Sequence, residues 1–206
     1  MSCKSRIVQN IINDCTTFIN GGIEQDYAYL INRKDVAATY NTTNDVIIDD
    51  LTIDTDTDAK PVYKLKGSGQ NIVVGADRVV NTDMPDLYTH YISFKGFQWD
   101  SASIANLDNM DDLVVIVVRK STSLVDGKIE VYGLQGGLSV SSDTFRSNTD
   151  NMTRTIELTS PEGSQESHSV YTYMQATTKE SPATEIETDA EKIAAGIEYL
   201  ESLLAE

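Results

Sequence analysis

The stretch LVVIVV, Leu113–Val118, is the longest apolar run in the chain. Its length is typical of a β-strand and lies far below the roughly 20 apolar residues that cross a bilayer. A strand with one face in water alternates apolar and polar side chains, and this run does not alternate. The run therefore predicts a buried strand that the rest of the protein covers on both faces.

Strand signals recur on both sides of this run, and several of them alternate. In MTRTIELT, Met152–Thr159, the side chains of Ile156 and Leu158 share one face. In KIEVY, residues 128–132, the side chains of Ile129 and Val131 oppose those of the other three residues. We expect strands at residues 27–31, 45–58 (a strand with an exposed loop), 61–66, 87–97, 113–119, 128–132, 138–141, 152–159 and 170–175. The pattern predicts a mostly β fold with few helices.

Two helices are expected within this β pattern. A short helix is expected at residues 101–111, between two strong strand signals. A clearer helix follows Thr188, which has capping-box spacing to Glu191. This second helix carries an apolar stripe made of Ile193, Ile197, Leu200 and Leu204. We expect the stripe to pack on the β-body of its own or an adjacent subunit, because a short isolated helix is marginal in water.

The chain divides into three predicted parts. Residues 1–20 are predicted to form an N-terminal arm, and residues 21–178 a β-rich domain. Residues 179–206 are predicted to form a linker and the C-terminal helix, since the sequence ahead of the helix is polar, contains Pro182 and has no strand pattern.

Acidic residues outnumber basic ones by 32 to 16, which gives the 206-residue chain a formal net charge of −16. Such a surface repels nucleic acid, because binding to phosphates needs clustered Lys and Arg. The densest basic spots, NRK, KLK and VRK, are each flanked by acids or by apolar strand. Acidity also keeps a concentrated protein in solution.

The two cysteines, Cys3 and Cys15, are predicted to be free thiols and not a metal site. The first residues, MSCKSRIVQN, lead into polar residues and contain no apolar signal-peptide region. We therefore expect the protein to fold in a cytoplasm.

The glycine-rich stretch KIEVYGLQGGLSVSSD, residues 128–143, is a candidate phosphate-binding loop. A P-loop needs Gly-Lys-Ser/Thr, and here Leu138 follows Gly137. A dinucleotide-binding loop needs a helix after its glycines, and here a strand pattern follows. The stretch is therefore predicted to be a β-turn whose glycines permit positive φ angles.

No other motif predicts catalysis. The aspartates of DTDTD, residues 54–58, lack the Gly and Glu that complete an EF-hand loop, so a solvated loop is expected, with a weak surface cation site as the alternative. His90 and His168 have no metal spacing, and Ser164 and Ser167 beside His168 form no nucleophile elbow. A glycosidase carboxylate pair stays open, although a single tryptophan, Trp99, offers little stacking surface. We predict that the protein is not an enzyme and has no catalytic, cofactor-binding or metal-binding residues.

Four tyrosines in strand segments leave two interpretations open. Tyr88, Tyr91, Tyr171 and Tyr173 can fill half-buried strand positions, which is their ordinary preference, or they can lie at subunit contacts.

Two stretches carry a resemblance to a known family. NGGIEQDYAYLINRKDV, residues 20–36, resembles the N-terminal segment of major tail proteins of phages that infect Bacteroidota. KIEVYGLQGGLSVSSDTFRSNTDNMTRTIELTSPEGSQESHSVY, residues 128–171, is similar to their second half, in which a strand, a glycine corner and a polar loop precede a final strand. The C-terminal helix departs from the minimal fold of that family.

The resemblance implies a tail tube protein. Subunits of this family pack two β-sheets, as a sandwich or barrel-like body with a flanking short helix, and form hexameric rings whose inner strands join into one barrel. The rings stack into a tube in the virion tail, assembled in the host bacterial cytoplasm, and an acidic lumen lets DNA pass without specific binding. The implied partners are further copies and other tail proteins (tail terminator, baseplate or tip, and sheath in a contractile tail), with no membrane.

Two other classes stay open at this stage. One is another virion structural protein, such as a head decoration protein, a head–tail joining ring or a tail terminator. The second is a β-sandwich adhesin or carbohydrate-binding module, against which the scarce aromatic residues count.

Overall fold

The computed structural model describes residues 27–54, 61–66, 71–82, 85–97, 106–107, 109–119, 129–147, 152–173 and 189–204. Its strands are β1 (Tyr27–Asn32), β2 (Val36–Tyr40), β3 (Ile47–Ile53), β4 (Val62–Lys66), β5 (Ile72–Val79), β6 (Leu87–Phe97), β7 (Leu113–Val118), β8 (Ile129–Tyr132), β9 (Ser139–Ser147), β10 (Met152–Thr159) and β11 (Tyr171–Tyr173). A 3₁₀ turn, η1 (Arg33–Asp35), follows β1, and helix α2 (Asp189–Ser202) lies near the C-terminus.

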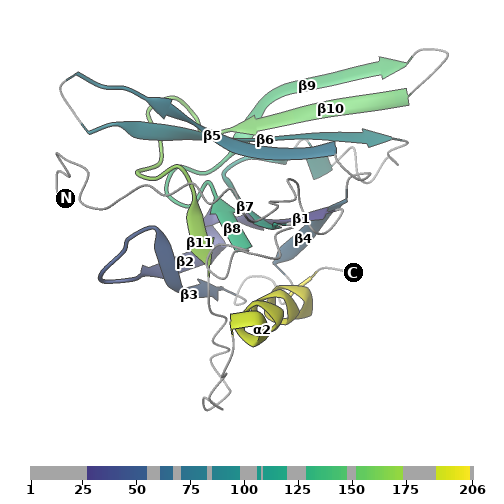
Figure 1. Ribbon diagram of the computed structural model, residues 1–206. Coiled ribbons are helices and arrows are strands. Elements are labelled where there is room, and N and C mark those ends of the chain that lie inside the picture. The colour runs from purple at the N-terminus through teal and green to yellow at the C-terminus, as the bar shows by residue number, and fades with distance from the viewer. Residues whose placement is uncertain are drawn as a thin grey trace, which may run out of the picture.

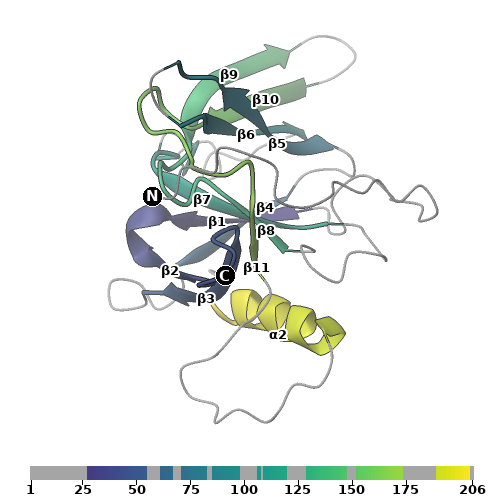
Figure 2. The ribbon, with the colours of Figure 1, turned by 60° about the vertical axis from the view of Figure 1, so that its left-hand side comes forward.

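The strands form two sheets. The larger has the order β2-β3-β11-β8-β7-β1-β4 and curls into a half-barrel. The smaller is an antiparallel sheet with the order β5-β6-β10-β9. The four-stranded sheet lies as a separate layer over the curled sheet, and α2 lies on the opposite side of the curled sheet (Figures 1 and 2). The predicted fold of two β-sheets with a C-terminal helix is confirmed.

Strand β7 separates two apolar cores, as its sequence predicts. All six of its side chains are buried. Val114, Ile116 and Val118 point into the curl of the seven-stranded sheet, where they join a cluster that we call the curl core. The alternate side chains, Leu113, Val115 and Val117, point toward the four-stranded sheet and join a second cluster, the sandwich core. The run does not alternate because protein covers both of its faces.

Strand β8 is also covered on both faces. Ile129 and Val131 lie in the curl core and Tyr132 in the sandwich core, so the alternation predicted in KIEVY is confirmed. Glu130 lies beside Tyr132 and is buried too, although its side chain is charged. Its Oε2 accepts hydrogen bonds from Arg119 Nε and the Tyr132 hydroxyl, each at 2.7 Å, and these bonds offset the cost of burying a carboxylate.

Helix α2 closes the open side of the curl. The helix packs Ile197, Tyr199 and Leu200 on the curl core, and Leu203 and Leu204, which follow its last residue, pack there too. Leu200 is fully buried, whereas the side chain of Ile193 lies outside the described ones. The Leu203 carbonyl accepts a hydrogen bond from the Val62 amide of edge strand β4 at 3.1 Å. The described members of the predicted stripe, Ile197, Leu200 and Leu204, therefore pack on the β-body of the same chain.

Two strands were not expected from the sequence, β2 and β5. Strand β5 contains Gly75, which weakens a strand, followed by the charged residues Asp77 and Arg78. The ring of Tyr91 on β6 lies over Gly75, with its hydroxyl 2.5 Å from where a β-carbon of residue 75 would stand. A side chain from the neighbouring strand thus covers the glycine, which a reading of β5 alone cannot detect.

Other predicted segments meet the structure only in part. Strand β9 extends to Ser147, beyond the predicted end at residue 141, because it pairs with β10 along its whole length. Of the helix predicted at residues 101–111, Asn106 and Leu107 are helical, and residues 101–105 lie outside the described ones. The predicted arm at residues 1–20, with Cys3 and Cys15, and the linker at residues 179–188 also lie outside them.

Candidate functional site

The glycine-rich stretch forms the turn that its sequence predicts. Gly133 and Gly137 have φ angles of 75° and 73°, and the Gly137 amide donates to the Gly133 carbonyl at 3.0 Å. Gly136 meets the turn at residues 161–164 so closely that a β-carbon would stand 1.7 Å from the Ser164 carbonyl oxygen. Glycine is therefore needed at two positions for its φ angle and at one for its size.

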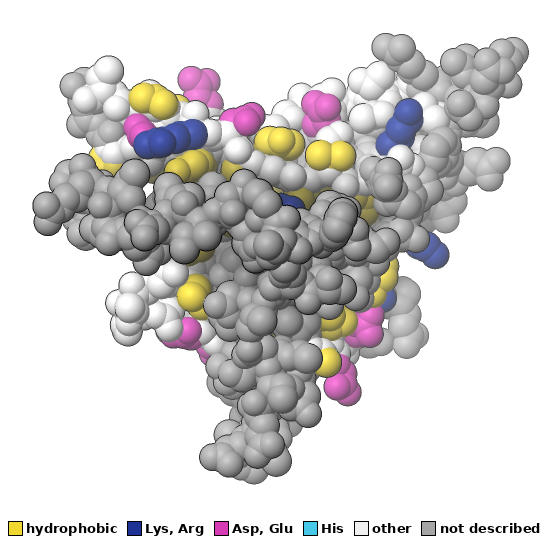
Figure 3. All heavy atoms as spheres, viewed as in Figure 1, with side chains coloured by type: hydrophobic (Ala, Val, Ile, Leu, Met, Phe, Trp, Pro, Cys, Tyr) yellow, Lys and Arg dark blue, Asp and Glu magenta, His cyan; other side chains and the backbone are white. Residues whose placement is uncertain are grey.

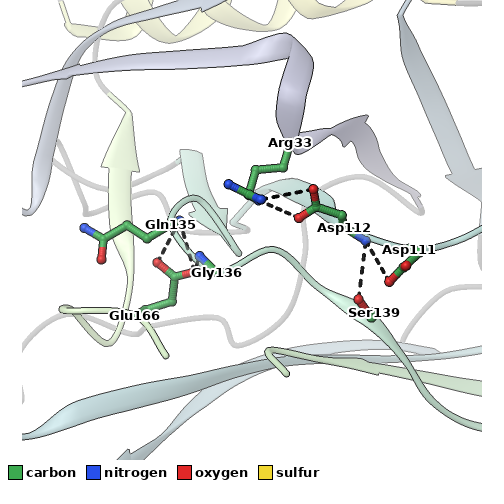
Figure 4. A network of polar contacts seen from close by, with 7 residues as sticks. All are labelled: Arg33, Asp111, Asp112, Gln135, Gly136, Ser139 and Glu166. Atoms are coloured by element: carbon green, nitrogen blue, oxygen red, sulfur yellow. Dashed lines mark hydrogen bonds and ion pairs between the residues drawn. The ribbon is translucent and has the colours of Figure 1, made fainter. Parts of the chain in front are cut away.

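The amides of this turn hold an anion, and the anion is the protein's own Glu166. This carboxylate is fully buried. Its Oε1 accepts from the Gly136 amide at 2.8 Å, its Oε2 from the Gln135 amide at 3.0 Å and from the Tyr171 hydroxyl at 3.2 Å. Figure 4 shows Glu166 beneath the turn, with both amides directed at it. The turn thus uses these amides to fix the polar segment before β11.

An ion pair anchors the same turn from the other side. Arg33, in η1, contacts the Asp112 carboxylate through Nε at 2.5 Å and Nη2 at 3.1 Å (Figure 4). Asp112 has a φ angle of 54°, and its amide bonds to the Ser139 hydroxyl at 3.3 Å. A β-carbon on Gly137 would stand 2.2 Å from Asp112 Oδ1. The ends of β1, β7 and β9 therefore meet around one carboxylate.

A buried histidine joins the two sheets at this junction. His90, on β6, is fully buried between the rings of Tyr132 and Tyr171, with centroids 5.2 and 6.0 Å from its own. Its Nδ1 lies 3.0 Å from the Gly133 amide, and its Nε2 lies 2.8 Å from the His168 carbonyl. Burial lowers the pKa of His90 below its ordinary value, and this effect exceeds the opposing attraction of the Glu166 carboxylate.

The candidate catalytic residues do not form a reactive group. The structure brings His90 and His168 together, but through the main chain of His168, whose ring faces Asp45 at 3.4 Å. The Ser167 hydroxyl contacts the Tyr171 hydroxyl at 3.2 Å and accepts a hydrogen bond from Gln135 Nε2 at 3.0 Å. Among the described residues, no three His, Cys, Asp or Glu side chains are placed to hold a metal ion. Of DTDTD, only Asp54 is described, and Trp99 is not.

A candidate binding surface is the outer face of the four-stranded sheet, which we call the open face. The strand register places alternate residues there, facing away from the sandwich core. Its described side chains include Val73, Asp77, Thr89, Tyr91, Ser93, Lys95, Ser142, Thr144, Thr155, Glu157 and Thr159. These side chains are rich in hydroxyl groups and include two carboxylates and one ammonium group.

A shallow hollow lies in the open face. Its volume is about 230 Å³, and it is lined by Asp77, Thr89, Tyr91, Ile92, Ser93, Glu157 and Thr159. The ring of Tyr91 crosses Gly75 on one side of the hollow. Of the four tyrosines left open by the sequence, Tyr171 and Tyr173 are fully buried in the curl core, whereas Tyr88 and Tyr91 are only half-buried.

Both edges of the four-stranded sheet are long. In the pairing of the described residues, β5 and β9 are edge strands of eight and nine residues. They carry large apolar side chains that are exposed: Val73 by 52%, Val140 by 40% and Phe145 by 57%. Figure 3 shows hydrophobic and acidic side chains side by side along the four-stranded sheet, at the top of the view. Among the described strands, none pairs with the outer side of β5 or of β9, and apolar side chains lie beside both edges.

Neither Glu166 nor the junction around it was predicted from the sequence. Glu166 is one of 32 acidic residues and lies in a polar segment without a motif.

None of the described helices is both long and apolar enough to span a membrane. The chain matches no model of a known protein family, and it matches no curated protein.

Proposed function

We propose that this protein is a tail tube subunit of a bacteriophage virion, whose copies join through the edges of the four-stranded sheet. The observation that carries the proposal is the combination of an open face with two long edge strands on the same sheet. The resemblance of residues 20–36 and 128–171 to major tail proteins supports the same assignment.

Exposed edges of this length need an explanation. A long edge with apolar side chains and free N–H and C=O groups pairs readily with another chain, and proteins normally shorten, charge or cover such edges. Here β5 and β9 lie at opposite edges of one sheet, so β9 of one copy can pair with β5 of the next. This head-to-tail contact is heterologous, and it closes into a ring when the rotation per copy divides a full turn. Six copies would form the hexameric ring that the family resemblance implies.

In such a ring the open face lines the channel. The described side chains of this face include the carboxylates of Asp77 and Glu157 and the ammonium group of Lys95. Among these described side chains, phosphates would meet hydroxyl groups and carboxylates, with no cluster of Lys or Arg to hold them. This lining suits a channel through which DNA moves without specific binding.

Electron microscopy of the purified protein tests the proposal, with rings or tubes as the expected result. The variant Val73→Lys, which puts a charge on edge strand β5, should leave the subunit folded and prevent assembly. Ala37→Lys is the matched control, because Ala37 is exposed on β2, an edge of the other sheet. A 22.7 kDa monomer at all concentrations, or equal effects of the two variants, would contradict the proposal.

The hollow in the open face favours a second candidate function, carbohydrate binding. Tyr91 offers an aromatic face, and Asp77 and Glu157 offer acceptors for sugar hydroxyl groups on either side of it. A glycan array measures this directly. Binding that Tyr91→Phe retains and Tyr91→Ala abolishes would favour this function over the tube.

A further inference from the structure

We infer that His90 forms a pH-sensitive hydrogen-bonded link, which joins the two sheets only while its imidazole is neutral. The inference does not depend on the proposed function. His90 lies on β6 of the four-stranded sheet. Its two ring partners belong to segments of the seven-stranded sheet: Gly133 follows β8, and His168 precedes β11. The imidazole is thus a polar link across the sandwich.

The two partners fix one protonation state. The Gly133 main-chain nitrogen is a donor, so Nδ1 must accept and carries no proton. The His168 carbonyl can only accept, so Nε2 must carry the proton. A proton added to Nδ1 would point at the Gly133 N–H, and the 3.0 Å contact would become a repulsion between two donors.

Nδ1 of His90 faces the Gly133 N–H, and burial outweighs the groups that favour an imidazolium, which are the Glu166 carboxylate and the main-chain carbonyls of His168 and Ser169. The charged or titratable groups that act on the His90 ring are Glu166 and the His168 ring. The aromatic rings of Tyr132 and Tyr171 pack against the His90 ring. Glu166 is the only carboxylate among these groups. It already accepts from the amides of the 133–137 turn. Protonation therefore either draws Glu166 away from the turn or expels the ring from its site, and both outcomes loosen the same junction.

The direction of the pH effect follows from proton uptake. The unfolded chain binds a proton at His90 near the ordinary pKa of 6.5, whereas burial lowers the pKa in the folded state. Below about pH 6.5 unfolding therefore takes up a proton. The unfolding equilibrium constant should rise by up to about tenfold per pH unit from this one group, until the pH reaches the folded-state pKa.

Urea unfolding between pH 7.5 and pH 5 tests the inference, with His90→Gln as the main variant. Glutamine supplies a neutral acceptor and donor at every pH. The unfolding equilibrium constant of the variant should therefore lack the rise of up to about tenfold per pH unit that His90 gives the wild type. His168→Gln is the control, because it removes the other ring and keeps the carbonyl that bonds His90. The inference fails if His90→Gln keeps the wild-type pH dependence, or if His168→Gln is the variant that removes it.

Nitrogen NMR of the wild-type imidazoles gives a test that needs no variant to fold. We expect the Nδ1 signal of His90 to stay that of an unprotonated nitrogen, and Nε2 to stay protonated, below pH 6. When the neutral imidazole is lost at lower pH, the native signal of the Gly133 amide should be lost at the same pH. A His90 ring that titrates near pH 6.5 while the tertiary structure persists would overturn the inference.

Discussion

The two sheets differ in what covers them. Strand β7, in the seven-stranded sheet, has the curl core on one face and the sandwich core on the other. Strand β10, in the four-stranded sheet, buries Ile156 and Leu158 on one face and presents Thr155 and Glu157 on the open face. The first sheet is the body of the subunit. The second sheet has a core on one face only, and we propose that its open face and its two edge strands contact other molecules.

The largest expected effect comes from placing a charge on a strand face that an apolar core covers. Placing a charge in a packed apolar site costs several kcal/mol, a large part of the stability of a domain. We expect Val115→Asp and Ile116→Asp each to prevent folding, because these neighbours face different cores. On β10, Ile156→Asp should do the same, whereas Thr155→Asp should change stability by no more than about 0.5 kcal/mol. Circular dichroism shows which of the four variants fold, and urea unfolding measures the stability of those that do.

The contrast between the two strands would be wrong if Thr155→Asp were as damaging as Ile156→Asp. It would equally be wrong if either β7 variant folded like the wild type.

A smaller effect is expected where α2 covers the curl core. Leu200→Asp should destabilise the subunit by a few kcal/mol, because Leu200 is fully buried against the curled sheet. Glu198→Gln is the matched control, since Glu198 is exposed on the same helix. Thermal unfolding measures both. A Leu200→Asp variant that melts like the wild type would mean that the helix contributes nothing to the closed curl.

The junction between the sheets should respond less strongly. Glu166→Gln keeps the shape of the side chain but removes the charge, and one of its oxygens becomes a donor facing the amides of the turn. We expect a loss of about 1–3 kcal/mol, the usual cost of a broken charge-assisted bond in a buried site. Glu162→Gln, exposed in the preceding turn, should be neutral in the same denaturant titration. Equal stability of the two variants would show that the turn does not need the carboxylate.

The smallest effect on stability is expected on the open face, where charge should alter only binding. The wild type should give no gel shift with duplex DNA at low salt, where phosphate attraction is strongest. The double variant Asp77→Lys, Glu157→Lys should remain stable and bind DNA in the assembled form, in a salt-sensitive way. Glu162→Lys with Glu198→Lys makes the same charge change elsewhere. Tight binding by the wild type would contradict the sliding channel.

Most of the body could be predicted from local pattern. LVVIVV predicted a strand covered twice, and MTRTIELT and the C-terminal stripe predicted the faces that are buried. Strand β5 was not predicted, because its own residues, which include Gly75 and the charged Asp77 and Arg78, do not favour a strand. What stabilises it is the long pairing with β6 and the ring of Tyr91, and both belong to another segment of the chain.

The sequence by itself determined which side chains must leave water, because hydrophobic periodicity is a property of neighbouring residues along the chain. It also determined where the chain turns, since glycines such as Gly133 and Gly137 reach positive φ angles at little cost. Only the tertiary structure decided that the turn at residues 133–137 holds Glu166, and that His90 bonds the main chain of both neighbouring segments. These contacts join residues about 30 to 80 positions apart, and a buried polar group takes whichever partner the packing brings to it.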